Sequence, residues 1–230
     1  MAVIKGLEWT FDTVASTYEK FRPGYTEELY RMIFDYIPIN ADSKVVEIGI
    51  GGGQATLPIL QTGCELTAVE YGESFSALCR EKFKGYPKFS VKTGKFEDTA
   101  FENNAFDFVY SASAFHWVPE EIDRIYGQYY YKFHNKKQET PTDYSEEQAQ
   151  CRAMIAEKYG FEDIKYGLFY RTRTFSAEEY RTLLGTYSDH IAIEETMRNE
   201  FFSKIEEAIN AHGGTITIYD TMDLQLARKP

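Results

Sequence analysis

Apolar residues recur along the chain at the spacings that are typical of strands and helices. Short apolar runs predict strands, and apolar residues three and four positions apart predict helices. The expected strands are 44–48, 66–69, 89–92, 106–110, 165–174 and 215–227. The expected helices are 8–22, 26–37, 54–60, 74–83, 145–159, 176–184 and 194–212. The first half therefore alternates strand and helix, which indicates an α/β fold with a parallel sheet.

A glycine-rich turn follows the first expected strand, because residues 47–53 read Glu-Ile-Gly-Ile-Gly-Gly-Gly. Glycine permits positive φ angles and lets a ligand approach the backbone, and the helix that follows favours polar or anionic groups. The dinucleotide fingerprint G-x-G-x-x-G would need a further glycine where Gln54 or Thr56 stands. The turn therefore predicts nucleotide binding, and the missing glycine disfavours an NAD-type oxidoreductase.

The spacing Glu47-x-Gly49-x-Gly51-x-Gly53 resembles the first motif of class I S-adenosylmethionine-dependent methyltransferases. The resemblance implies that these four residues bind S-adenosylmethionine. Glu70 ends the second expected strand, 19 residues after Gly51. An acid at this place can accept hydrogen bonds from a ribose diol, although an ordinary carboxylate at a strand end is the alternative.

Two later loops resemble further cofactor-binding loops of the same family. After the third strand, the residues matching Phe96 and Glu97 contact the adenine in family members, whereas a solvated turn is the alternative here. Lys95 stands where the family often has Asp, so this match is partial. After the fourth strand, the small residues that include Ser111 and Ser113 would let the methionine part of the cofactor lie close.

A second resemblance indicates which residues would contact the methyl acceptor, that is, the molecule that receives the methyl group. Residues 115–118, Phe-His-Trp-Val, resemble type 11 methyltransferases, especially the branch related to trans-aconitate methyltransferase. His116 is a candidate general base or a polar prop beside the cofactor, and Trp117 a candidate wall of the acceptor pocket.

The ends of the chain add three candidates to the acceptor side. The segment from Phe11 to Tyr25 looks like the N-terminal cap of small-molecule methyltransferases, in which Tyr18 and Arg22 would face the site. The alternative is that Tyr18 packs in the core and that Arg22 forms an ion pair at the surface. Residues 175–188 also resemble the trans-aconitate branch, and there Tyr187 would border the acceptor pocket.

The family resemblance implies a Rossmann-like, doubly wound sheet of seven strands. The last strand would be antiparallel, helices would cover both faces, and residues 1–40 would form a helical cap on a single domain, 1–230. However, residues 118–160 contain no apolar run that could form the fifth strand. We therefore expect a segment to be missing near residues 121–124, as a deletion or as a break in the chain.

The composition of the chain limits the kinds of binding partner and the compartment that we expect. The net charge of −11 and the lack of a long basic run argue against nucleic acid. Three scattered cysteines argue against disulfides or a metal site and favour a reducing cytoplasm. No apolar run is long enough to span a membrane, and no signal peptide is visible.

These features predict a cytoplasmic methyltransferase, a monomer or a homodimer, that acts on a small molecule. Arg22 would meet a carboxylate acceptor, because a guanidinium pairs bidentately with a carboxylate. A non-catalytic S-adenosylmethionine-binding subunit is the alternative that the sequence leaves open.

Overall fold

The computed structural model describes residues 8–114 and 145–230 of the chain. Its contacts divide the chain into two compact units, and each is described by itself. Unit 1 comprises residues 1–24, 39–122 and 174–216. Unit 2 comprises residues 25–38, 123–173 and 217–230.

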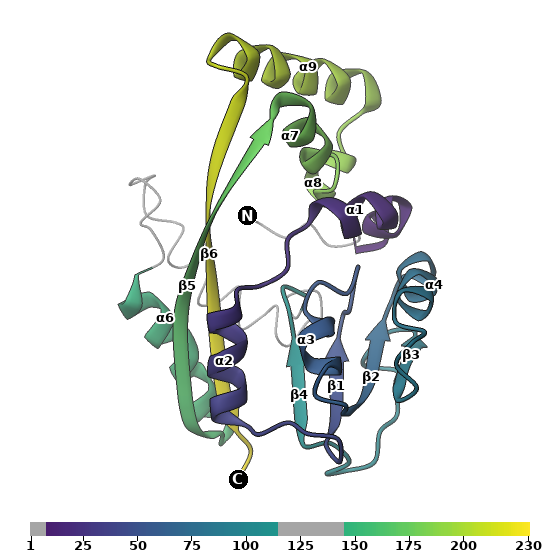
Figure 1. Cartoon of the computed structure of the whole chain (residues 1–230), viewed down its shortest axis with the longest axis vertical. Coiled ribbons are helices and arrows are strands. Elements are labelled where there is room, and N and C mark those ends of the chain that lie inside the picture. Colours follow the sequence, from purple (N-terminus) through teal and green to yellow (C-terminus); the bar gives the residue numbers. More distant parts are fainter. Residues whose placement is uncertain (1–7, 115–144) are drawn as a thin grey trace. The chain divides into compact units, whose positions relative to one another are not determined.

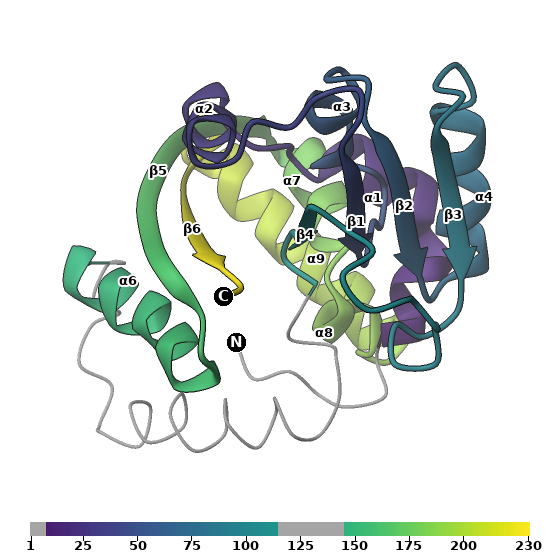
Figure 2. The same cartoon turned by 90° about the horizontal axis from the view of Figure 1, so that it is seen from below.

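Unit 1 contains a parallel sheet of four strands in the order β3-β2-β1-β4 (Figure 2). The strands are β1 (Lys44–Ile48), β2 (Glu65–Glu70), β3 (Phe89–Thr93) and β4 (Phe108–Ser111). Ile48 at the end of β1 is opposite Val69 of β2 and Ser111 of β4. The carboxyl ends of these three strands therefore lie at the same edge of the sheet, where ligands bind in open α/β sheets.

The helices of unit 1 come from both halves of the chain. They are η1 (Glu8–Val14), α1 (Ala15–Phe21), α3 (Thr56–Leu60), α4 (Glu73–Lys82), α7 (Ala177–Leu184), α8 (Ser188–Ile191) and α9 (Glu195–Ala211). Residues of β1 and β2 such as Val45 and Leu66 are fully buried, as expected for central strands covered on both faces. Ser176 and Glu179 form a capping box that starts α7.

Unit 2 is built around two long antiparallel strands (Figure 1). Its elements are α2 (Glu27–Tyr36), α6 (Glu146–Ala153), η3 (Met154–Tyr159), β5 (Glu162–Ser176) and β6 (Thr215–Arg228), although the ends of β5 and β6 belong to unit 1. Helix α2 contacts β5, because the hydroxyl of Tyr36 donates to the carbonyl of Asp163 at 2.9 Å. Helix α6 contacts β6 through an ion pair between Arg152 and Asp223 at 2.6 Å.

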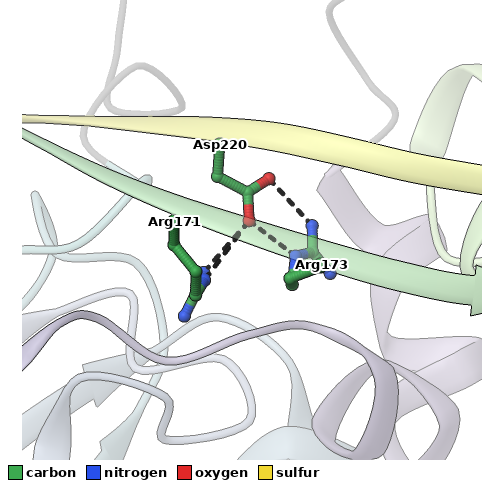
Figure 3. A network of polar contacts seen from close by, with 3 residues as sticks. All are labelled: Arg171, Arg173 and Asp220. Carbon is green, nitrogen blue, oxygen red and sulfur yellow. Dashed lines mark hydrogen bonds and ion pairs between the residues drawn. The ribbon is translucent and has the colours of Figure 1, made fainter.

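Two arginines of β5 share one aspartate of β6 (Figure 3). Arg173 donates to both carboxylate oxygens of Asp220, at 2.5 and 3.0 Å. Arg171 donates to one of them at 3.3 Å. Burial alone would raise the pKa of Asp220, but the hydrogen bond and charge of Arg173 and the charge of Arg171 outweigh it and lower that pKa. These contacts hold β5 against β6.

The expected seven-stranded sheet is confirmed only in part. The parallel α/β sheet is present, and the last strand of the chain is antiparallel to its neighbour. Within the described residues, however, β5 and β6 pair with each other and no strand continues the sheet beyond β4. The segment expected to be missing near residues 121–124 lies outside the described residues.

Candidate functional site

The loop after β1 folds as its glycines predict. Gly49, Gly51 and Gly53 have φ angles of 70°, 52° and 72°, which side-chain-bearing residues rarely adopt. The amide of Gly49 donates to the carbonyl of Val69 at 2.8 Å and so joins the loop to the end of β2. A Cβ at Gly51 would have no neighbour nearer than the ring of Tyr18, 3.7 Å away. A side chain at Gly51 would therefore meet only ordinary van der Waals contacts, and the positive φ angle is what favours glycine there.

Glu47 lies in the core beneath this loop. It is 1% exposed, and one carboxylate oxygen accepts hydrogen bonds from the hydroxyls of Thr56 and Tyr110, both at 2.8 Å. Burial raises the pKa of Glu47 to about 7, although the two hydroxyl donors oppose the shift. Glu47 thus joins β1 to α3 and β4, and its predicted cofactor contact stays a prediction.

Glu70 connects the loops that follow β1 and β2. Its Oε2 accepts from the amide of Gly51 and its Oε1 from the amide of Gly72, each at 2.8 Å. Burial raises the pKa of Glu70, and these amide donors counteract the rise. Each carboxylate oxygen has a second lone pair, so the fixed carboxylate can still accept a ligand hydroxyl.

The structure brings together Tyr18, Arg22 and Tyr187, the three candidates that the family resemblance placed on the acceptor side, and their role there stays a prediction. Arg22 follows α1, and its Nε and Nη2 donate to the hydroxyl and the carbonyl of Thr186, both at 3.0 Å. Its guanidinium carbon lies 4.9 Å from the ring centre of Tyr18 and 4.0 Å from that of Tyr187. Among the described residues, Nη1 of Arg22 has no hydrogen-bond acceptor. The guanidinium is therefore fixed between two rings with one nitrogen available.

The other predicted cofactor residues give a mixed picture. Ser111 ends β4 and its hydroxyl donates to the carbonyl of Ile48 at 2.9 Å, while Ser113 has a φ of 58°. Phe96 is half-buried and its ring lies 6.4 Å from that of Phe101. Glu97 is exposed. The cofactor roles of these four residues stay predictions.

His116 and Trp117 lie outside the described residues, and their roles stay predictions. Among the described residues, no group of three or more His, Cys, Asp or Glu side chains could hold a metal ion. No described helix has the length and the apolar character that crossing a membrane requires.

Sequence reasoning missed residues that shape the two loops from a distance. Asp12 accepts hydrogen bonds from the amides of Ser74 and Phe75 at the start of α4. Lys82 donates to the carbonyl of Gly52 at 2.9 Å. Asp12 is 62 residues from Ser74, and Lys82 is 30 residues from Gly52, so no local pattern could indicate these pairs.

The site fits a nucleoside cofactor. Gly51 adopts the left-handed conformation, and its own amide fixes the carboxylate of Glu70 beside it. A ribose diol needs a hydrogen-bond acceptor of this kind at the end of the second strand. The carboxylate of Glu70 and the glycine loop therefore agree with the cofactor that the sequence motif implies.

Comparisons with known proteins support this interpretation. A family model described as a methyltransferase domain matches residues 46–130. An uncharacterized methyltransferase of Schizosaccharomyces pombe is 24% identical over 223 residues, which cover 87% of each chain. The YcgJ protein of Bacillus subtilis has the same fold with a TM-score of 0.52 at 13% identity, covering 89% of this chain and 100% of that one.

A second solved structure was determined with a cofactor product bound. Phosphoethanolamine N-methyltransferase 2 of Haemonchus contortus, in complex with phosphomonomethylethanolamine and S-adenosylhomocysteine, has a TM-score of 0.51 at 15% identity. The match covers 99% of this chain but only 61% of the Haemonchus chain. The resemblance to the trans-aconitate branch stays a prediction.

The glycine loop, the relatives and the fold agree with one another and favour a methyltransferase over an NAD-type oxidoreductase. The methyltransferase-domain match, the relatives and the shared fold together support a class I S-adenosylmethionine-dependent methyltransferase, an enzyme whose cofactor is S-adenosylmethionine.

Proposed function

We propose that the enzyme transfers a methyl group to a small molecule whose carboxylate binds Arg22. The observation that carries this proposal is the fixed guanidinium between Tyr18 and Tyr187. Two of its nitrogens are held by Thr186, so the side chain loses little conformational freedom when an anion binds Nη1. A site prepared in this way favours a small anionic acceptor.

The position of Arg22 supports an acceptor beside the cofactor. Tyr18, which contacts one face of the guanidinium, also lies beside Gly51, because a Cβ there would be 3.7 Å from its ring. Burial raises the pKa of the Tyr18 phenol, the charge of Arg22 opposes this rise, and the negative charge of Glu70 adds to it, so the charge of Glu70 reaches Tyr18 as well. The proposed acceptor site and the glycine loop are therefore joined through one aromatic ring.

A carboxylate acceptor simplifies what the protein must do. When bound, S-adenosylmethionine supplies an electrophilic methyl group and becomes S-adenosylhomocysteine. A carboxylate is already ionised near neutral pH, so no side chain has to remove a proton from it. Arg22 would orient the acceptor, and the rings of Tyr18 and Tyr187 would limit access of water to it.

Arg22 variants test the acceptor class. We expect small carboxylates to be converted to methyl esters, with S-adenosylhomocysteine formed in step. Arg22→Ala should raise the acceptor KM by roughly tenfold or more, because a charge-assisted hydrogen bond is lost. Arg22→Lys should be intermediate, since lysine keeps the charge but lacks the planar guanidinium that binds Thr186 and the acceptor together.

Lys20→Ala, which removes an exposed cation of α1, is the matched control and should leave the KM unchanged. Calorimetric titration with S-adenosylhomocysteine should show that the Arg22 variants keep their cofactor affinity. Turnover confined to amines or alcohols would overturn the carboxylate proposal and would require a general base.

We also propose that Glu70 binds the cofactor ribose. Its carboxylate is held in place by the amides of Gly51 and Gly72. Glu70→Ala should weaken S-adenosylhomocysteine binding by roughly 10- to 100-fold, because one or two hydrogen bonds to a charged group are lost. Titration calorimetry measures the loss, with the exposed neighbour Glu73→Ala as control. Unchanged affinity of a folded Glu70→Ala protein would refute the assignment.

A further inference from the structure

The N-terminal segment, residues 8–22, packs against the loops that follow β1 and β2. Both η1 and α1 contact α4 within unit 1 (Figure 1). A Cβ at Gly52 would lie 2.9 Å from the Cα of Glu19, and a Cβ at Gly72 would collide with the carboxylate of Asp12. Neither glycine has a positive φ angle. These two glycines therefore make room for the N-terminal segment.

Asp12 caps α4 from this segment. Helix α4 begins at Glu73, and its own N-cap residue, Gly72, has no side chain to accept from the first amides. Asp12 supplies both missing acceptors, since its Oδ2 accepts from Ser74 at 3.1 Å and its Oδ1 from Phe75 at 3.0 Å. An anion at this end of a helix also interacts favourably with the helix dipole.

The capped end of α4 is close in sequence to the proposed ribose ligand, because the N-cap position, Gly72, is two residues after Glu70. Gly72, whose amide holds Oε1 of Glu70, is also the glycine against which the Asp12 carboxylate packs. The charge of Asp12 is close enough to add to the raised pKa of Glu70, a rise that is caused first by burial. The conformation of the loop from Glu70 to Ser74 is thus fixed at both ends, by Glu70 itself and by Asp12.

We propose that Asp12 is a positioning residue for the cofactor. It holds the loop between β2 and α4 in the conformation that directs Glu70 to the ribose. This inference rests on the ribose assignment of Glu70 proposed above. A purely structural cap would instead stabilise α4 without changing cofactor affinity.

Substitution of Asp12 tests this role. Asp12→Ala should weaken S-adenosylhomocysteine binding by about five- to tenfold, the effect of losing one good cap. Asp12→Asn should restore most of the affinity, because asparagine caps helices about as well as aspartate. Asp42→Ala, an exposed aspartate of unit 1, is the matched control and should bind normally. Titration calorimetry on the full chain gives all four affinities.

Hydrogen exchange supplies a readout that does not depend on activity. The amides of Ser74 and Phe75 should exchange faster in Asp12→Ala, because they lose their acceptors. Faster exchange with unchanged affinity would show that Asp12 is a structural cap only and would overturn the proposal.

A double variant separates this proposal from the assignment of Glu70. If Asp12 acts through Glu70, Asp12→Ala should cost little further affinity in a Glu70→Ala background. Full additivity of the two losses would overturn the positioning role while leaving the ribose assignment intact. Normal affinity of Glu70→Ala together with weak binding by Asp12→Ala would refute the ribose assignment and the route through Glu70.

Discussion

Glu47 is a buried carboxylate that accepts hydrogen bonds from two neutral hydroxyls, those of Thr56 and Tyr110. Burial raises its pKa from an ordinary value of 4.5 to about 7. Between these two values the folded protein keeps a proton that the unfolded chain has released. Its contribution to stability is therefore full below about pH 4.5 and is lost as the pH rises through 7.

Replacing Glu47 by Gln should change how stability depends on pH. Glutamine resembles the protonated acid, so the variant lacks the cost of ionising a buried group. From pH 5 to pH 8, the free energy of unfolding of Glu47→Gln relative to the parent should rise by roughly 2–3 kcal/mol. Urea unfolding at both pH values measures it, with exposed Glu65→Gln as control. A difference that does not vary with pH would contradict the raised pKa.

The boundaries of the elements could be predicted where the signal is local. The expected strand 44–48 is β1, and the expected helix 74–83 differs from α4 by one residue at each end. Strand alternation and helical spacing are properties of neighbouring residues, so one sequence contains them. The expected helix 8–22 is instead a 3₁₀ helix followed by an α-helix, and the four-residue α8 was not predicted.

Contacts between elements could not be predicted in the same way. The sequence placed Tyr18 and Arg22 on the N-terminal segment and Tyr187 far along the chain, and the family resemblance alone brought them together. The hydrogen bonds that fix Arg22 reach Thr186, 164 residues away. Gly52 was read as part of a ligand loop, whereas its missing side chain makes room for α1 at Glu19. Such pairs form only in the folded chain, so the spacing of neighbouring residues in the sequence cannot predict them.

At the scale of the whole chain, the proposed cofactor and acceptor residues fall in one unit, and most of the strand pair β5 and β6 falls in the other. The glycine loop, Glu70 and Arg22 belong to unit 1, whereas most of β5 and β6 belongs to unit 2. The sequence predicted both strands but assigned them to one seven-stranded sheet. Their pairing with each other is held by Asp220, which balances Arg171 and Arg173. The stability of this strand pair can therefore be changed without touching the proposed cofactor and acceptor residues.

Asp220→Asn tests this separation. The variant keeps the shape of the side chain but leaves two arginines side by side without their shared anion. Because the carboxylate is partly exposed, at 19%, the loss should be roughly 1–3 kcal/mol in local stability. Hydrogen exchange should accelerate in β5 and β6 but not in β1 and β2, and S-adenosylhomocysteine affinity should be unchanged. Exposed Glu162→Gln in β5 is the control and should exchange as the parent does. Equal acceleration in all four strands would show that the two units open together.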